Sequence, residues 1–114
     1  MGRLDDPDIR ARYFQALSLW QCSGYITWKW RAREFVQQEL EGLTPTLVGK
    51  LMFEYVQSGG EIDRCEEGRT QWLEWKYHYD LRIPICGRLM YIETVIIDDD
   101  PDDWTITVVN MHYA

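Results

Sequence analysis

The apolar residues of this chain change their spacing at Ser58-Gly59-Gly60, and this change constrains the fold more than any other feature. Before it, apolar residues recur every three or four positions, which is the period of an amphipathic helix. After it, they alternate with polar residues in runs rich in β-branched and aromatic side chains, as in strands. The sequence therefore predicts an α+β fold with helices in the N-terminal half and a sheet in the C-terminal half.

Two or three helices are predicted between residues 5 and 58. An aspartate or threonine followed by proline marks a helix start, because the side chain caps free N–H groups and proline suits the first turn. A glycine after the last apolar position marks a helix end. These signals predict a first helix from Asp6-Pro7 to about Ser23-Gly24, a second from Thr27 to Leu40 and a third that begins at Thr44-Pro45.

An antiparallel meander of three or four strands is predicted over residues 61–113. Turn residues and alternation place the strands at Tyr77 to Ile83, Leu89 to Ile97 and Trp104 to Tyr113, with Glu61 to Glu66 as a short edge strand. The segment Arg69 to Trp75 has no clear period. The helices are expected to pack on one face of this sheet, which gives a single domain over residues 1–114.

Both faces of the last two strands carry apolar residues, for example Ile92 on one face and Val95 on the other. One layer of helices covers only one face. Either the N-terminal helix wraps around to the second face, or that face is an interface in a homo-oligomer or a complex with another protein.

The net charge of −7 falls entirely on residues 61–114, and five aspartates account for most of it: Asp98, Asp99, Asp100, Asp102 and Asp103. A charge confined to one loop does not exclude a nucleic-acid substrate. The loop lacks the glycine and glutamate of a calcium-binding loop. It is interpreted as a solvated turn or as a phosphate mimic that binds a basic protein partner.

No apolar run is long enough to span a membrane, and the N-terminus lacks a signal-peptide core, so a cytoplasmic protein is expected. The cysteines Cys22, Cys65 and Cys86 are far apart and have no zinc-site spacing, which predicts reduced, mostly buried thiols. We expect no metal ion and no cofactor.

Proton-transfer chemistry would use His78 or His112, because histidine titrates near neutral pH. Arg82 and Arg88 flank the predicted turn at Pro84 to Gly87 and would clamp a phosphate. Further basic residues that would bind RNA are Arg31, Arg33 and Lys76. Each of these residues also has a purely structural interpretation, as a surface or hydrogen-bonded side chain.

Three short motifs give the chain a family resemblance: Gly42-Leu43-Thr44-Pro45-Thr46-Leu47-Val48, Gly59-Gly60-Glu61-Ile62 and Gly87-Arg88-Leu89. In this order they resemble the RelE/ParE-like toxin superfamily, in particular its BrnT-like branch, over roughly residues 27–114. The resemblance implies an endoribonuclease inhibited by an antitoxin. It also implies that His112 or His78 is the acid or base, that Arg82 and Arg88 bind the phosphate, and that Tyr113 is a supporting donor.

Two function hypotheses therefore remain: an RNA-cleaving toxin, or a non-catalytic acidic interaction module such as a nucleic-acid mimic. The toxin hypothesis predicts that the two histidines and two arginines converge, with the aspartate loop away from them. The interaction hypothesis predicts that the aspartate loop projects from a carboxylate-rich face.

Overall fold

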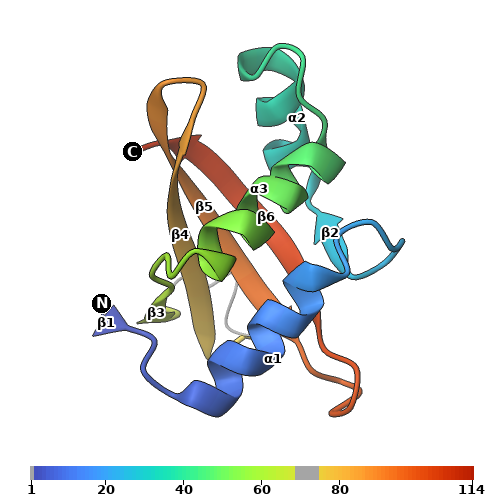
Figure 1. The fold of residues 1–114 in the computed structure, drawn as a ribbon, viewed down its shortest axis with the longest axis vertical. Coiled ribbons are helices and arrows are strands. Elements are labelled where there is room, and N and C mark those ends of the chain that lie inside the picture. Colours follow the sequence, from blue (N-terminus) through green and yellow to red (C-terminus); the bar gives the residue numbers. More distant parts are fainter. Residues whose placement is uncertain (1, 69–74) are drawn as a thin grey trace.

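The computed structural model describes residues 2–68 and 75–114, which form three helices and a six-stranded sheet (Figure 1). In chain order the elements are β1 (Gly2–Arg3), α1 (Pro7–Ser18), β2 (Ile26–Trp28), α2 (Trp30–Glu39), α3 (Pro45–Gln57), β3 (Asp63–Glu66), β4 (Tyr77–Ile85), β5 (Arg88–Ile97) and β6 (Thr105–Tyr113). The predicted α+β class is confirmed. Residues 69–74, which include most of the segment without a clear period, lie outside the described residues.

The sheet has the strand order β1-β3-β4-β5-β6-β2 and is mixed. Strands β3 to β6 form an antiparallel meander as predicted, but β2 pairs in parallel with β6, and β1 adds a strand beside β3. The prediction of a purely antiparallel sheet of three or four strands is therefore wrong. Both missed strands are very short and come from the N-terminal half, where the helical period dominates the pattern.

The predicted helix starts are confirmed at α1 and α3. The Asp6 carboxylate accepts from the Asp8 and Ile9 N–H groups at 3.0 and 3.3 Å, and the Thr44 hydroxyl accepts from the Leu47 N–H at 3.2 Å. The predicted end of α1 and start of α2 are wrong. The helix α1 ends at Ser18, and residues 26–28, whose β-branched and aromatic side chains favour a strand, form β2 instead of the first turn of α2.

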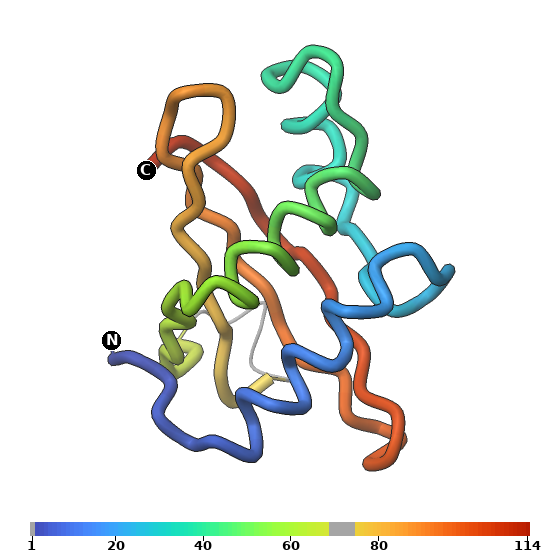
Figure 2. The backbone as a smooth tube through the Cα atoms, in the orientation of Figure 1, coloured from blue at the N-terminus to red at the C-terminus, as the bar shows by residue number. Residues whose placement is uncertain are grey.

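Helices α1 and α3 lie side by side across one face of the sheet, as Figures 1 and 2 show from the same direction. The core forms between these helices and the sheet, and its fully buried members include Leu17, Val48, Met52, Leu81, Ile92 and Val108. A buried polar pair ties the two layers together: the Tyr13 and Thr94 hydroxyls are 2.8 Å apart, and the Thr94 hydroxyl donates to the Tyr79 carbonyl at 2.6 Å.

The opposite face of the sheet carries Asp80, Glu93 and Val95, which are 0, 5 and 1% exposed. Register places Glu93 beside Asp80, and strand alternation puts these side chains on the face away from Tyr79 and Thr94. Helix α1 packs with α3 on the first face, so the expected wrap of the N-terminal helix to the second face is not seen. An interface on the second face stays a prediction.

The thiols are more accessible than predicted. Cys22 lies in the turn after α1 and Cys86 at the tip of the β4–β5 hairpin, and both are exposed, whereas Cys65 in β3 is partly buried. The prediction of mostly buried thiols is therefore wrong for two of the three cysteines, because turns rather than core positions hold them. In the described part of the chain, no helix combines the length and apolar character needed to cross a membrane.

Candidate functional site

The register of the sheet places Arg82, Tyr91 and His112 in one row across β4, β5 and β6. Residues paired in this way project from the same face of a sheet. The Tyr91 and His112 rings are stacked, with their centroids 4.8 Å apart and their planes inclined by 20°. The Arg82 guanidinium lies 5.7 Å from the centroid of the Tyr91 ring. A guanidinium and an imidazole therefore border a single phenol ring.

Arg88 and Tyr113 form a second pair at the same end of the sheet, but on its opposite face. The Arg88 guanidinium lies 3.7 Å from the centroid of the Tyr113 ring. The Tyr113 hydroxyl donates to the Glu39 carboxylate at 3.1 Å, and burial together with this carboxylate raises the pKa of Tyr113. Tyr113 therefore holds its proton and donates a hydrogen bond to Glu39, and its role as a donor to a substrate stays a prediction.

A groove runs between α2 and β6 beside these two pairs. Its lining includes Trp30, Arg31, Phe35, His112 and Tyr113. Trp30 is 66% exposed, and the Arg31 guanidinium lies 5.6 Å from the centroid of its ring. An exposed aromatic ring with a neighbouring arginine is an arrangement that stacks nucleobases. The groove connects the end of β6 with α2, and its charge is mixed, because Glu34 and Glu39 line it together with Arg31.

The hydrogen bond of His112 fixes its tautomer. Its Nδ1 lies 2.9 Å from the Tyr113 carbonyl oxygen. A carbonyl oxygen only accepts, so Nδ1 carries the proton in the neutral ring, and Nε2 has the lone pair. His112 is exposed, so Nε2 is suited to accept a proton from a bound substrate.

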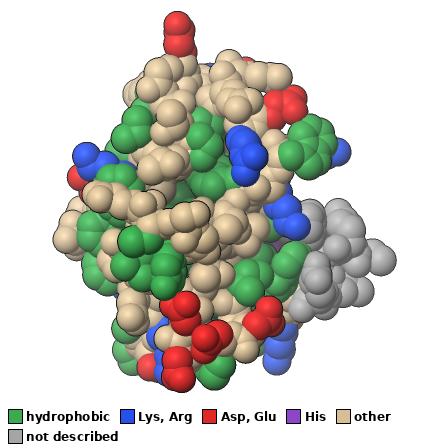
Figure 3. All heavy atoms as spheres, turned by 90° about the vertical axis from the view of Figure 1, so that its right-hand side faces the viewer, with side chains coloured by type: hydrophobic (Ala, Val, Ile, Leu, Met, Phe, Trp, Pro, Cys, Tyr) green, Lys and Arg blue, Asp and Glu red, His purple; other side chains and the backbone are tan. Residues whose placement is uncertain are grey.

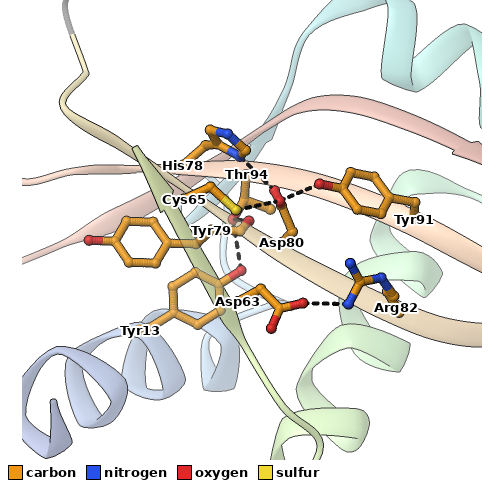
Figure 4. Close-up of polar contacts among 9 residues, drawn as sticks. All are labelled: Tyr13, Asp63, Cys65, His78, Tyr79, Asp80, Arg82, Tyr91 and Thr94. Carbon is orange, nitrogen blue, oxygen red and sulfur yellow. Dashed lines mark hydrogen bonds and ion pairs between the residues drawn. The ribbon is translucent and has the colours of Figure 1, made fainter. Parts of the chain in front are cut away.

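The second predicted histidine, His78, belongs to a different cluster, shown in Figure 4. Its Nδ1 lies 2.9 Å from one oxygen of the buried Asp80 carboxylate. The other oxygen accepts from the Cys65 thiol at 3.3 Å and from the Tyr91 hydroxyl. Burial, reinforced by the Asp80 charge, raises the pKa of Cys65 to about 12, so this thiol is not an activated nucleophile.

The structure brings only part of the predicted site together, and the expected convergence of two histidines and two arginines is not seen. Arg82, Arg88, His112 and Tyr113 gather at the C-terminal end of β6, divided between the two faces of the sheet, and Arg31 lines the adjoining groove. Three predicted residues do not join this set. His78 contacts Asp80, Arg33 is exposed on α2 and does not line the groove, and Lys76 precedes β4, with its Nζ 5.4 Å from the Tyr77 ring centroid.

The aspartate loop lies at the other end of β5 and β6. Pairing of these strands begins at Met90 and Tyr113 and finishes at Ile97 and Thr105, just before the loop. Acidic side chains gather at the corresponding lower end of the molecule in Figure 3. All five aspartates are exposed. The toxin hypothesis expects this separation.

Sequence reasoning missed two central residues, Tyr91 and Asp80. In the sequence, Tyr91 lies in an apolar run and Asp80 in an alternating strand, so neither stands out as a site residue. The spacing of Asp80 does indicate its neighbours, because alternate residues of a strand share one face and Asp80 lies between His78 and Arg82. The partner across the hairpin depends on the register, which the two-residue turn at Cys86-Gly87 fixes.

Comparison with known proteins gives no match: no family model, no curated protein and no solved structure matches this chain.

Proposed function

We propose that the chain is an endoribonuclease of the toxin–antitoxin type and that its site is the C-terminal end of β6. One observation carries the proposal: Arg82 and His112 border the Tyr91 ring on one face of this end of the sheet, while Arg88 lies on the other face and Arg31 in the adjoining groove. An RNA phosphate needs cationic donors, and its cleavage needs a proton acceptor near neutral pH. The end of β6 offers both.

The proposed reaction is transfer of the phosphoryl group to the neighbouring ribose oxygen. His112 Nε2 takes the proton of the 2′-hydroxyl, the 2′-oxygen forms a bond to phosphorus, and the bond from phosphorus to the 5′-oxygen breaks. The leaving 5′-oxygen takes up a proton from solvent, and His112 later releases its proton to solvent, so the products are a 2′,3′-cyclic phosphate and a 5′-hydroxyl. Arg82 stabilises the charge on the phosphoryl oxygens, because guanidinium donors bind the transition state more strongly than the ground state.

Base stacking in the α2–β6 groove gives the substrate preference. Trp30 and Phe35 offer aromatic surface beside His112, and Arg31 adds a cation. Unstacked bases are available only in single-stranded RNA, so we propose single-stranded or ribosome-bound RNA as the substrate and the cytoplasm as the place of action. An antitoxin that covers this end of the sheet would inhibit the enzyme.

The proposal is tested with end-labelled single-stranded RNA. The wild type is expected to yield fragments with a 2′,3′-cyclic phosphate. His112→Gln and Arg82→Ala should each lower kcat/KM at least about a hundredfold, in line with loss of general acid–base or electrostatic catalysis. Lys50→Ala is the matched control, because Lys50 is an exposed cation on α3 that does not line the groove, and it should retain full activity.

The variants must also be shown to fold, by circular dichroism and thermal unfolding. If folded His112→Gln cleaves RNA as fast as the wild type, or if the wild type leaves free and ribosome-bound RNA intact, the proposal is wrong. Expression in a host culture adds a second readout, since the wild type should arrest growth and His112→Gln should not.

The aspartate loop favours a second candidate, an acidic surface that binds a basic protein. The loop is held in place, because the Arg12 guanidinium donates to the Pro101 carbonyl at 2.6 Å and the Asp102 N–H donates to Asp100 at 3.0 Å. A cluster of exposed carboxylates can imitate the charge of a phosphate backbone. A variant with Asp99→Asn and Asp100→Asn should lose a salt-sensitive partner in affinity capture, while RNA cleavage stays unchanged.

A further inference from the structure

Three side chains of metal-ligating type meet on the face of the sheet opposite the helices. Cys65 of β3 pairs in register with His78 of β4, and Asp80 lies two residues further along β4 on the same face. The thiol sulfur, a ring nitrogen and a carboxylate oxygen all lie within 4.8 Å of one another. We propose that Cys65, His78 and Asp80 bind a divalent metal ion, with zinc as the preferred ion.

The spacing of the donor atoms suits a tetrahedral ion. Zinc ligands lie about 2.0 to 2.3 Å from the metal, so donor atoms in a tetrahedron are roughly 3.3 to 3.7 Å apart. The Asp80 carboxylate is 3.3 Å from the Cys65 sulfur and 2.9 Å from His78 Nδ1. These two distances involve different oxygens of Asp80, and the three donor atoms lie within 4.8 Å of one another, so an ion placed among them requires side-chain shifts of roughly 1 Å. The mixture of sulfur, nitrogen and oxygen donors favours zinc over magnesium or calcium, which prefer oxygen alone.

The charge of the cluster also favours a bound cation. Asp80 is 0% exposed, and His78 is the one group capable of positive charge with which it forms an ion pair among the described residues. With neutral His78, the buried cluster carries one negative charge, which is costly to bury. When Zn²⁺ binds, the Cys65 thiol gives its proton to solvent and forms a sulfur–zinc bond. The thiolate and the carboxylate then balance the two positive charges of the ion.

A fourth position remains beside the three protein donors. The Tyr91 hydroxyl donates to Asp80 and lies next to the cluster (Figure 4), so this hydroxyl or a water molecule would complete the coordination. His78 is partly exposed, with 14% of its side chain accessible, which gives the ion a path to the cluster. The inference concerns a site apart from His112 and does not depend on RNA cleavage.

Metal binding is measured on the full chain after treatment with a chelator. Zn²⁺ is titrated against a chromophoric competitor, and Co²⁺ is added to a second sample as a spectroscopic probe. We expect one equivalent of Zn²⁺ per chain and a sulfur-to-cobalt charge-transfer band. Cys65→Ser and His78→Gln should each weaken zinc binding at least about tenfold, because each removes a ligand.

Cys86→Ser and His112→Gln are the matched controls, since both remove a ligand of the same type from an exposed position outside the cluster. Both should bind Zn²⁺ like the wild type. The Co²⁺ spectrum of the wild type tests the site even where a ligand variant fails to fold. The proposal is overturned if the wild type gives no charge-transfer band, or if folded Cys65→Ser and His78→Gln bind Zn²⁺ as tightly as the controls.

Discussion

The imidazole of His112 stacks on the phenol ring of Tyr91, and the two ring centroids are 4.8 Å apart. The hydroxyl of the same tyrosine donates to the buried Asp80 carboxylate. Tyr91 therefore connects two clusters on the outer face of the sheet. Its ring supports the proposed proton acceptor, and its hydroxyl satisfies the carboxylate, so the two contributions can be separated by substitution.

Tyr91→Phe keeps the ring and removes the hydroxyl. We expect a loss of about 1 to 2 kcal/mol in the free energy of unfolding, because one donor to a buried carboxylate disappears, while RNA cleavage is largely retained. Tyr91→Leu removes the stacking surface as well and should lower kcat. Urea unfolding and cleavage kinetics measure the two effects. If Tyr91→Phe loses as much activity as Tyr91→Leu, the ring does not position His112.

The hairpin between β4 and β5 gives a second prediction. Register pairs Ile85 with Arg88, and the two residues between them have positive φ, 53° at Cys86 and 78° at Gly87. Both values fit the turn that matches the twist of antiparallel strands. Gly87→Ala should destabilise the fold by about 1 kcal/mol, because a Cβ disfavours this conformation.

Gly68→Ala is the control for Gly87→Ala. At both glycines an added Cβ meets nothing within 4 Å, but only Gly87 has a positive φ. Urea unfolding should therefore show a loss for Gly87→Ala and almost none for Gly68→Ala. Equal losses would show that the turn conformation is not the cause.

The sequence predicted the elements that carry a long local pattern. The start of α1 at Asp6-Pro7, the start of α3 at Thr44-Pro45 and the β4–β5–β6 meander follow from capping, helical period and alternation. It did not predict β1 or β2. A strand of two or three residues has too few positions to show alternation, and its pairing with a distant strand is a tertiary interaction.

In the candidate site, too, the sequence predicted residues with a local signal and missed those whose role depends on tertiary contacts. Arg82 and Arg88 were recognised because they flank a turn, and His112 because histidine has a suitable pKa. Asp80 has the polar parity of its strand, which gives no sign of burial, yet it is fully buried. Parity identifies which residues share a face of a strand, but the burial of that face depends on what packs against it.

The three thiols should react at different rates in the metal-free protein. Cys22 and Cys86 are exposed, whereas burial and the Asp80 charge raise the pKa of Cys65 to about 12. Thiolate is the reactive form, so iodoacetamide at about pH 8 should modify Cys22 and Cys86 well before Cys65. Mass spectrometry of the peptides measures each rate. Labelling of Cys65 as fast as Cys86 in the folded protein would contradict the burial of this cluster.

Tyr13 makes stability fall at high pH. Its side chain is fully buried, and this burial outweighs the opposing effect of the Thr94 hydrogen bond and raises the Tyr13 pKa above the ordinary value of 10.0. In the unfolded chain the phenol loses its proton near pH 10, whereas the folded protein retains it. The folded state then binds more protons, so stability is complete below about pH 10 and declines above it, by up to about 1.4 kcal/mol per pH unit.

Tyr13→Phe isolates this effect, because every other tyrosine is common to both proteins. At about pH 7 the variant should be less stable by about 1 kcal/mol, since it lacks the hydroxyl that contacts Thr94. At about pH 11 the difference should shrink or reverse, because phenylalanine has no proton to lose. Urea unfolding at both pH values measures it. A stability difference that stays constant between them would mean that the Tyr13 phenol ionises as readily in the folded protein as in the unfolded chain.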